Sequence, residues 1–450
     1  MTVAMDKAGG LAEGFGRVPA HGCGWVNALR SRGVGAFAKQ GFPKAKQEEW
    51  RDTNAAPLVE TPFVAARRAG AKAARELAAR YSFGPQAAAE LVFVNGFYEP
   101  ELSRTDTQLD VCVMSLAEAL EKEPLAEGHL GKYAKIDQHP FAAINTAYLQ
   151  DGAFVHLGRG ATCTKPIHLL FLTADSEEPS AAHPRALVVA DANSEGFIVE
   201  TYAGQDAGVY LCNAVTEIVV GSGARLDHNM MQQEGESAYH TALMQVAQDA
   251  GSAFVSHSTS MGGKLTRNDL QVSLNGEGAE ATLNGLVYAH GEQHIDNHTL
   301  LLHEKGHCTS HELYKHVLAD KATAVFKGKI YVQKDAQKTD SKQTSKALLL
   351  SDTACMNSQP ALEIYADDVK CTHGSTTGPV DANAVFYLIS RGLSRAQARH
   401  LMTYAFAADI TRRIRIAPVR ARIEDYMAAQ HGLPQDLRIT EEAAADVAMM

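Results

Sequence analysis

The chain has 450 residues, of which 45% are hydrophobic and 21% charged, and its 42 basic and 52 acidic side chains give a net charge of −10. This ordinary globular composition excludes disorder and collagen, and the acidic balance argues against a nucleic-acid binder that relies on a basic surface. No apolar run approaches the ~18 residues of a membrane span, and the N-terminal residues lack the apolar core of a secretory signal, so a cytoplasmic location is expected.

The first part of the chain is rich in alanine and predicts helices. The run from Arg67 to Arg80 is dense in strong helix formers. Leu91–Val94 predicts a short strand that ends in the turn pair Asn95-Gly96. Ser115, followed by Glu118, is typical of a capping box and predicts the start of another helix.

The middle of the chain changes to short β-prone runs separated by Gly, Asn and Asp, which predicts a large all-β body. Sandwich, barrel and β-helix all fit this pattern, although the lack of long-range Greek-key spacing favours a β-solenoid. No strict short repeat supports that choice. The polar segment Gln333–Lys346, in which Ala336 is the one apolar residue, predicts a solvated loop or an outward-facing coil. The β-prone runs are Ala186–Val189, Phe197–Thr201, Val209–Cys212, Glu217–Val220, Phe254–His257, Leu270–Leu274, Thr299–Leu302, Ala324–Phe326, Ile330–Val332 and Leu362–Tyr365.

Beyond Gly378-Pro379 the pattern predicts a small helical module. An amphipathic run begins at Asp381 and stops at Gly392, Ser394 can cap a second helix, and Pro418 can open a third. The last residues, TEEAAADVAMM, predict a frayed tail. Five arginines make the module locally basic on an acidic protein, which indicates a partner surface. They are Arg412, Arg413, Arg415, Arg420 and Arg422.

These changes of residue pattern along the chain predict three domains. A mainly helical domain is expected over residues 1–150, a β core over 151–378, and a helical module with its short tail over 379–450.

A cluster of histidines in the β body contains a peptidase-like motif. His303-Glu304-Lys305-Gly306-His307 matches H-E-x-x-H, which binds zinc when both histidines lie on one helical face. Here a glycine interrupts the motif and strand-like residues precede it, so we expect polar, turn-facing histidines. A zinc-dependent hydrolase that uses His303, Glu304 and His307 is the alternative. The cluster comprises His290, His294, His298, His303, His307, His311 and His316.

Other motifs of catalysis are absent from the sequence. Gly263-Lys264 and Gly328-Lys329 lack the upstream glycine of a phosphate-binding loop, and no G-x-S-x-G elbow occurs. The chain is therefore expected not to hydrolyse ATP and not to be an enzyme. Its seven cysteines form no C-x-x-C pair, and their odd number predicts reduced thiols.

The segment YADDVKCTHGSTTG, residues 365–378, carries the remaining candidates. Cys371 and His373 are two residues apart, so on one extended strand both side chains lie on the same face. A thiolate and an imidazole there could share a soft metal or an iron–sulfur unit, with further ligands from another chain. The alternative is that both are ordinary strand residues with a structural role.

The same segment resembles the SufB/SufD family of iron–sulfur cluster assembly proteins. The resemblance covers most of the chain and is densest from about residue 285 to 410. It is closer to the SufD branch, because SufB-type proteins typically carry an N-terminal cysteine motif and a glutamate where this chain has Gly374. The motifs that carry it are Ala366–Gly374, Phe386-Tyr387-Leu388, Arg391-Gly392, His307–Ser310, Glu312–Lys315, Phe326–Ile330, Asp335–Thr339 and, more weakly, Pro43–Thr53, Phe93–Gly96 and Phe141–Gly152.

The resemblance implies a right-handed parallel β-helix core flanked by N-terminal and C-terminal helical domains. It also implies a non-catalytic subunit that pairs with a SufB-like subunit through the β-helix and binds a SufC-like ABC ATPase through the C-terminal helices; a homodimer is also compatible. No nucleic-acid or membrane partner is implied. No cofactor is expected to be held tightly by the chain alone, although iron or a nascent cluster could be bound transiently at the subunit interface. His373 is the first candidate there and Cys371 the second. A pure structural adaptor, without a ligand role for His373, is the competing interpretation.

Overall fold

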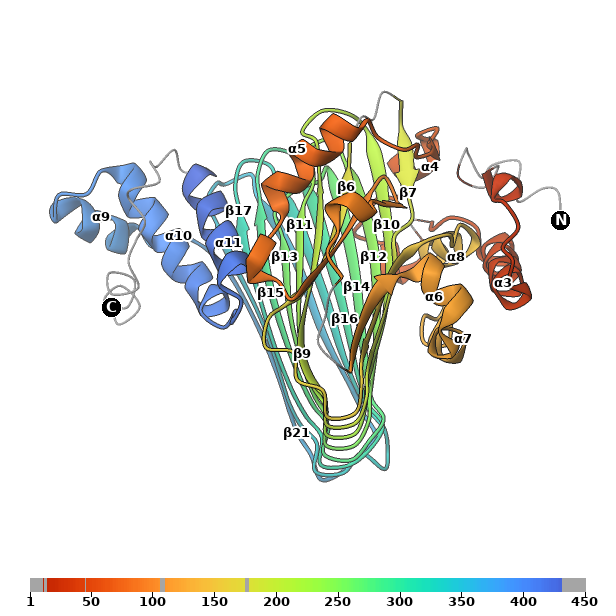
Figure 1. Cartoon of the computed structure of the whole chain (residues 1–450). Coiled ribbons are helices and arrows are strands. Elements are labelled where there is room, and N and C mark those ends of the chain that lie inside the picture. The colour runs from red at the N-terminus through yellow and green to blue at the C-terminus, as the bar shows by residue number, and fades with distance from the viewer. Residues whose placement is uncertain (1–10, 12–13, 45, 106–109, 175–177, 431–450) are drawn as a thin grey trace.

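A computed structural model describes residues 11, 14–44, 46–105, 110–174 and 178–430. Two parallel sheets face each other in this part of the chain and form a β-solenoid of about 8 turns, whose coils lie one behind another (Figure 1). The predicted β-helix core flanked by helices is confirmed. The predicted frayed tail lies outside the described residues, and so does the N-terminal segment predicted to carry no secretory signal, except for residues 11, 14 and 15.

The two sheets alternate along the chain, so each coil contributes one strand to each sheet. Sheet A consists of β4 (Val111–Ser115), β5 (Gly152–Leu157), β8 (Arg185–Ala190), β10 (Tyr210–Val220), β12 (Tyr239–Gln248), β14 (Leu265–Leu274), β16 (His294–His303), β18 (Thr323–Val332) and β20 (Cys355–Ile364), with β1 (Val64–Ala65) and β7 (Ser180–Ala182) at its side. Sheet B consists of β3 (Phe97–Tyr98), β2 (Ala89–Val94), β6 (Ile167–Thr173), β9 (Glu195–Gly204), β11 (Arg225–Gln233), β13 (Ala253–Ser260), β15 (Glu280–Ala289), β17 (Thr309–Leu318), β19 (Asp340–Leu349) and β21 (Lys370–Pro379).

Consecutive coils stack in register, which places side chains in columns that run through the interior. The spacing of the coils is irregular, because Tyr239 pairs with Leu265, 26 residues later, whereas Thr323 pairs with Cys355, 32 residues later. This variation explains why the sequence shows no strict repeat. The apolar core lies between the two sheets and includes Leu283, Phe326 and Ile330.

The interior also contains columns of polar side chains, one from each successive coil. These columns contradict part of the prediction for residues 333–346. Residues 340–349 form strand β19, in which Ser341 and Gln343 are buried while Lys342 is exposed. The buried polar groups bond to the preceding coil, since Ser341 Oγ lies 2.6 Å from Ser310 Oγ. The prediction of a loop or outward-facing coil was therefore wrong from residue 340 onward, because hydrogen bonds between coils hold Ser341 and Gln343 inside the solenoid.

Local signals at the ends of elements were reliable. Asn95 and Gly96 both adopt positive φ and connect β2 to the antiparallel β3, as the turn pair predicts. The Ser115 hydroxyl accepts from the Glu118 amide at the start of α6, and Ser394 forms a complete capping box at the start of α10. The described helices are α3 (Gly24–Gln40), α4 (Ala56–Glu60), α5 (Ala71–Tyr81), α6 (Leu116–Lys122), α7 (Pro124–His129), α8 (Pro140–Ala147), α9 (Ala382–Ser390), α10 (Arg395–Thr411) and α11 (Ala417–Gln430).

Helices lie on the outer faces of both sheets, whereas α9 extends away from the solenoid (Figure 1). Helices α6 and α8 contact strands of sheet A, while α5 and α10 contact strands of sheet B. The C-terminal module is fixed by apolar contact, because Ala407 and Ile410 pack in one buried cluster with Leu286 and Val317 of sheet B. Among the described helices, none is both long and apolar enough to cross a membrane.

One buried ion pair connects the N-terminal region to sheet A. Arg185 and Glu217, on the neighbouring strands β8 and β10, are both fully buried and their side chains pair directly. Glu217 also accepts from the backbone amides of residues 131, 133 and 134, and Arg185 donates to Asn145 and Thr146. Although burial alone would raise it, Arg185 and these amides hold the pKa of Glu217 below its usual value.

Glu217→Gln should lower the free energy of unfolding by about 3–5 kcal/mol, because Arg185 then stays buried without a counter-charge. Urea denaturation followed by circular dichroism measures this loss. Glu118→Gln is the matched control, since its ion pair with Lys122 lies on the surface and should leave the midpoint nearly unchanged. Equal midpoints for the two variants would contradict the anchoring role of the buried pair.

Candidate functional site at the open end of the solenoid

The two ends of the solenoid differ in how their strand edges are covered. At the N-terminal end, the short antiparallel strands β3 and β4 terminate the sheets. At the C-terminal end, β20 and β21 have ten residues each and, within the part of the chain that the structure describes, pair on one side only. Pro360 interrupts the free edge of β20, whereas β21 has no proline before its last residue. Long unpaired edges of this kind are templates for pairing with another chain.

Cys371 and His373 lie on β21 and face the interior of the solenoid. Cys371 continues the column of the buried Ser341, and His373 continues the column of the buried Gln343. No further described coil covers them, so His373 is exposed and Cys371 is half-buried against the apolar core. The register thus places both side chains on one face, in agreement with their spacing of two residues.

The groups beneath this pair are polar. Gln343 Nε2 donates to Glu312 Oε2 over 2.6 Å, so Glu312, Gln343 and His373 follow one another in a single column. Burial raises the pKa of Glu312 to about 7. Burial also raises the pKa of the Cys371 thiol, and the nearby Asp340 acts in the same direction. The cysteine is therefore largely a neutral thiol at neutral pH and becomes a strong ligand only when a metal displaces its proton.

Apolar side chains are exposed beside this end of the molecule. Among the described residues, six large apolar side chains are exposed, and five of them lie between residues 364 and 389. Tyr365 follows β20 directly and is 57% exposed, while Phe386 on α9 is 72% exposed. The prediction of an amphipathic run from Asp381 did not include this surface. The signal was the unbroken apolar run VFYLI, which is wider than one buried helix face.

The H-E-x-x-H motif does not form a metal site. His303 ends β16 and is buried, with Nε2 2.9 Å from Ser310 Oγ, whereas His307 lies in the following turn with a φ of 60° and an exposed side chain. The His303 imidazole points to the interior and the His307 imidazole points to the surface, because a strand followed by a turn replaces the helix that the motif requires. The zinc-hydrolase alternative is therefore wrong. Burial lowers the pKa of His303 to about 4.

The expectation that the histidines of residues 290–316 face turns was also wrong for several of them. His298 lies within β16 and pairs with the buried Asp296, with Nε2 and Oδ1 3.0 Å apart. His316 is wholly buried within β17 and packs near the rings of Tyr314 and Phe326. The carboxylate beside His298 comes from its own strand, and the rings beside His316 come from its own strand and from β18.

Comparisons with known proteins agree with the architecture. A family model described as the SufBD protein N-terminal region matches residues 14–169, and one described as the SUF system FeS cluster assembly SufBD core domain matches residues 171–406. The chain is 34% identical over 402 residues to an iron–sulfur cluster assembly SufBD family protein of Synechocystis sp., covering 86% of this chain and 87% of that protein. It is 32% identical over 381 residues to the iron–sulfur cluster assembly protein SufD of Escherichia coli, covering 84% and 86%.

A more distant relative is SufD of Bacillus subtilis, at 26% identity over 317 residues, which covers 68% of this chain and 71% of that protein. The two family models together span the N-terminal helices, the solenoid and the first C-terminal helices. The resemblance drawn from the sequence is thus confirmed, and the chain belongs to the SufBD family of SUF-system iron–sulfur cluster assembly proteins, with SufD proteins among its relatives.

Proposed function

We propose that this chain is a non-catalytic, SufD-like subunit of a cytoplasmic scaffold on which iron–sulfur clusters are assembled. It pairs with a SufB-like subunit through the open end of the solenoid and binds a SufC-like ATPase through its C-terminal helices. The observation that carries the proposal is the open end itself. Two ten-residue strand edges lie beside an inward-facing cysteine and histidine that no described coil covers.

The unpaired backbone edge of β21 supports pairing of subunits at this end. A partner strand that adds to β21 would satisfy its free amide and carbonyl groups and would extend the columns of Ser341 and Gln343 by one more layer. The partner's side chains would then lie next to Cys371 and His373. The exposed Tyr365 and Ile364 add apolar area to the same contact.

Cys371 and His373 form an incomplete set of donors, which is compatible with cluster assembly between two subunits. Imidazole nitrogen and thiolate sulfur both bind iron in iron–sulfur proteins, but two donors hold a cluster only weakly. With further ligands from the partner, the joined site would hold iron and sulfide as the cargo under construction. Each subunit alone would bind little, so assembly is confined to the paired state.

The C-terminal module supports an ATPase partner. Phe386, Tyr387 and Ile389 expose an apolar surface on α9, while α10 and α11 are already packed on sheet B. Two of the five arginines expected to form a partner surface are used within the chain, since Arg415 lies over Phe197 and Arg422 lies over Tyr81. We therefore assign the docking role to α9 rather than to the arginines.

The position of α9 also explains how ATP could act on the site. Helix α9 begins three residues after β21, so the strand that carries His373 and the docking helix are directly continuous. Lys315 of β17 holds α10 through Asp409 and through the carbonyl of Phe406, with Nζ 2.7 Å from that oxygen. A movement of the ATPase would thus be transmitted to the edge strand while the rest of the module stays attached.

His373→Ala should reduce cluster formation in the complete complex by about tenfold or more, because a donor to iron is lost. Complex recovery and the absorbance of reconstituted cluster are measured in the same preparations. Thr372→Ala, which changes an exposed residue on the opposite face of β21, is the matched control, and Cys371→Ser should have the smaller effect of the two ligand variants. A normal complex with its full complement of cluster in His373→Ala would leave only the adaptor role.

Phe386→Glu should weaken binding of the ATPase subunit by about tenfold or more, because it places a charge in an apolar contact. Calorimetric titration of the purified subunits measures this affinity. Asn383→Ala, one turn earlier on the same helix, is the control and should bind normally. Point substitutions are preferable to deletion of residues 379–450, since deletion would expose apolar residues of sheet B. Unchanged affinity in Phe386→Glu would place the ATPase elsewhere on the chain.

A further inference from the structure

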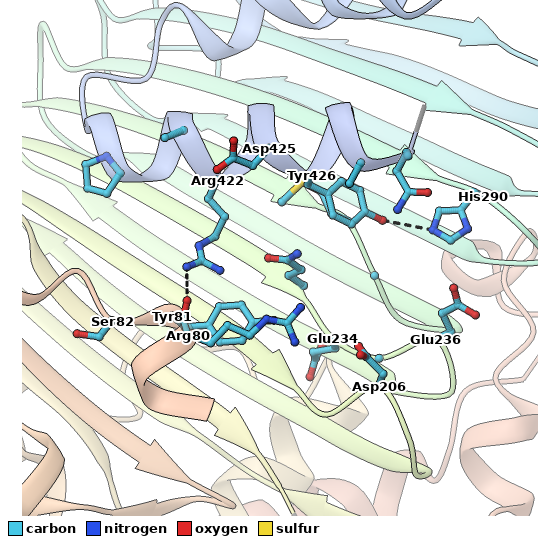
Figure 2. Close-up of a pocket in the computed structure, with 18 of the residues that line it drawn as sticks. Arg80, Tyr81, Ser82, Asp206, Glu234, Glu236, His290, Arg422, Asp425 and Tyr426 are labelled. Atoms are coloured by element: carbon cyan, nitrogen blue, oxygen red, sulfur yellow. Dashed lines mark hydrogen bonds between the residues drawn. The ribbon is translucent and has the colours of Figure 1, made fainter. Parts of the chain in front are cut away.

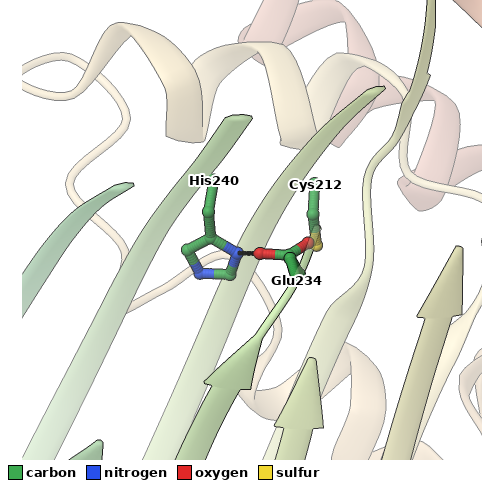
Figure 3. Close-up of side chains that lie close together, drawn as sticks. All are labelled: Cys212, Glu234 and His240. Carbon is green, nitrogen blue, oxygen red and sulfur yellow. Dashed lines mark ion pairs between the residues drawn. The ribbon is translucent and has the colours of Figure 1, made fainter. Parts of the chain in front are cut away.

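A second group of potential metal ligands lies deep in the solenoid, far along the chain from Cys371 and His373. Cys212 is on β10, His240 is on β12, and Glu234 follows the last residue of β11 in the opposite sheet. One ligand atom from each of the three lies within 4.8 Å of the others, and all three residues are buried (Figure 3). It is the one group of this kind among the described residues.

The fold holds these side chains together. Cys212 and His240 are direct register partners on neighbouring parallel strands, so their side chains are adjacent on the inner face. The glutamate is positioned by its own loop, since Tyr210 Oη accepts from the Gly235 amide over 3.0 Å. A Cβ at Gly235 would lie 2.5 Å from the Gln205 carbonyl oxygen, so glycine is required for the close approach of this loop to the preceding coil.

The donor atoms converge and are incompletely bonded. His240 Nδ1 lies 2.8 Å from Glu234 Oε2, which also accepts from Gln232 Nε2 over 3.1 Å. His240 is fully buried, and apart from the ion pair of Nδ1 with Glu234 neither ring nitrogen has a hydrogen-bond partner among the described residues. The ring of Tyr202 packs against this imidazole with centroids 5.1 Å apart and fixes its orientation. Gln232 thus serves as an outer partner that orients the carboxylate.

We infer that Cys212, Glu234 and His240 form a buried binding site for one divalent transition-metal ion such as Zn²⁺ or Fe²⁺. A sulfur, a nitrogen and an oxygen donor are the set that such borderline ions accept, and three protein ligands leave a fourth position open. One thiolate and one carboxylate also neutralise the double positive charge, which a buried site requires. On binding, the S–H bond of Cys212 breaks, the sulfur bonds to the ion, and the proton leaves to solvent without electron transfer.

One ligand of the site, Glu234, also lines a surface pocket. This pocket of about 720 Å³ lies between α11, the end of α5 and the turns of the solenoid (Figure 2). Three other carboxylates, from Asp206, Glu236 and Asp425, line the same pocket and favour the approach of a cation. The two arginines of the pocket are engaged by the ring of Tyr81, with centroid distances of 5.4 Å for Arg80 and 4.5 Å for Arg422.

Cobalt is the probe that tests this site, because Co²⁺ takes zinc sites and gives a thiolate-to-metal absorption band. The untagged full chain is produced in medium supplemented with Co²⁺, so that a buried site can fill during folding. We expect one cobalt per chain and a sulfur–cobalt charge-transfer band in the near ultraviolet. Cys212→Ser should abolish the band, and His240→Gln or Glu234→Gln should lower the bound cobalt by about tenfold or more.

Two cysteine variants serve as matched controls. Cys163→Ser removes another buried thiol, and Cys371→Ser removes the thiol of the open end; both should keep the band. Circular dichroism verifies that each variant is folded, and if Cys212→Ser does not fold, loss of cobalt in a folded His240→Gln variant supports the site. Addition of Zn²⁺ should also raise the melting temperature of the metal-free wild type. Folded wild-type chain without cobalt, cobalt bound without the band, or a band that persists in Cys212→Ser would overturn the assignment.

Discussion

In-register stacking of parallel strands is the constraint on which the rest of this structure depends. Each strand of the solenoid obtains its backbone hydrogen bonds from the coils before and after it, so free edges remain at the two ends. Short antiparallel strands terminate the first coil, whereas β20 and β21 leave ten-residue edges at the last. The location of the proposed subunit interface is therefore a consequence of the fold, and α9 leads directly from it to the proposed docking surface for the ATPase.

The same stacking also explains how a β-rich core can hold so many ionisable groups. A side chain in one coil lies next to a side chain of equivalent position in the next coil, so polar residues can hydrogen-bond to one another in columns, as Glu312 and Gln343 do. Ligand pairs arise in two ways from this geometry. Cys371 and His373 are neighbours along one strand, whereas Cys212 and His240 are neighbours across two strands. The pair of Cys371 and His373 is open to solvent and suits a site shared with another subunit. The pair of Cys212 and His240 is enclosed and suits an ion that stays with the chain.

Both helical regions are attached to the solenoid by apolar contact, and each attachment also includes a charged pair. The N-terminal region packs Leu58 and Phe141 against Leu243 of sheet A and adds the buried pair of Arg185 and Glu217, whose disruption leaves an unpaired charge. The C-terminal module is anchored by apolar contact along sheet B and by Lys315, which leaves α9 with an exposed apolar face. A rigid attachment beside a free docking helix is what a subunit needs if an external ATPase is to move its edge strand.

The sequence by itself determined the local features, the three regions of different residue pattern and the family. The turn at Asn95-Gly96, the caps at Ser115 and Ser394, and the common face of Cys371 and His373 each depend on residues within one turn or one strand. The tertiary structure alone decided which polar residues are buried. It separated His303 from His307, turned residues 340–349 into a strand, and joined Cys212 to Glu234 and His240. The physical reason is that coils of 26 to 33 residues stack without a fixed repeat, so the register that brings distant side chains together cannot be read along the chain.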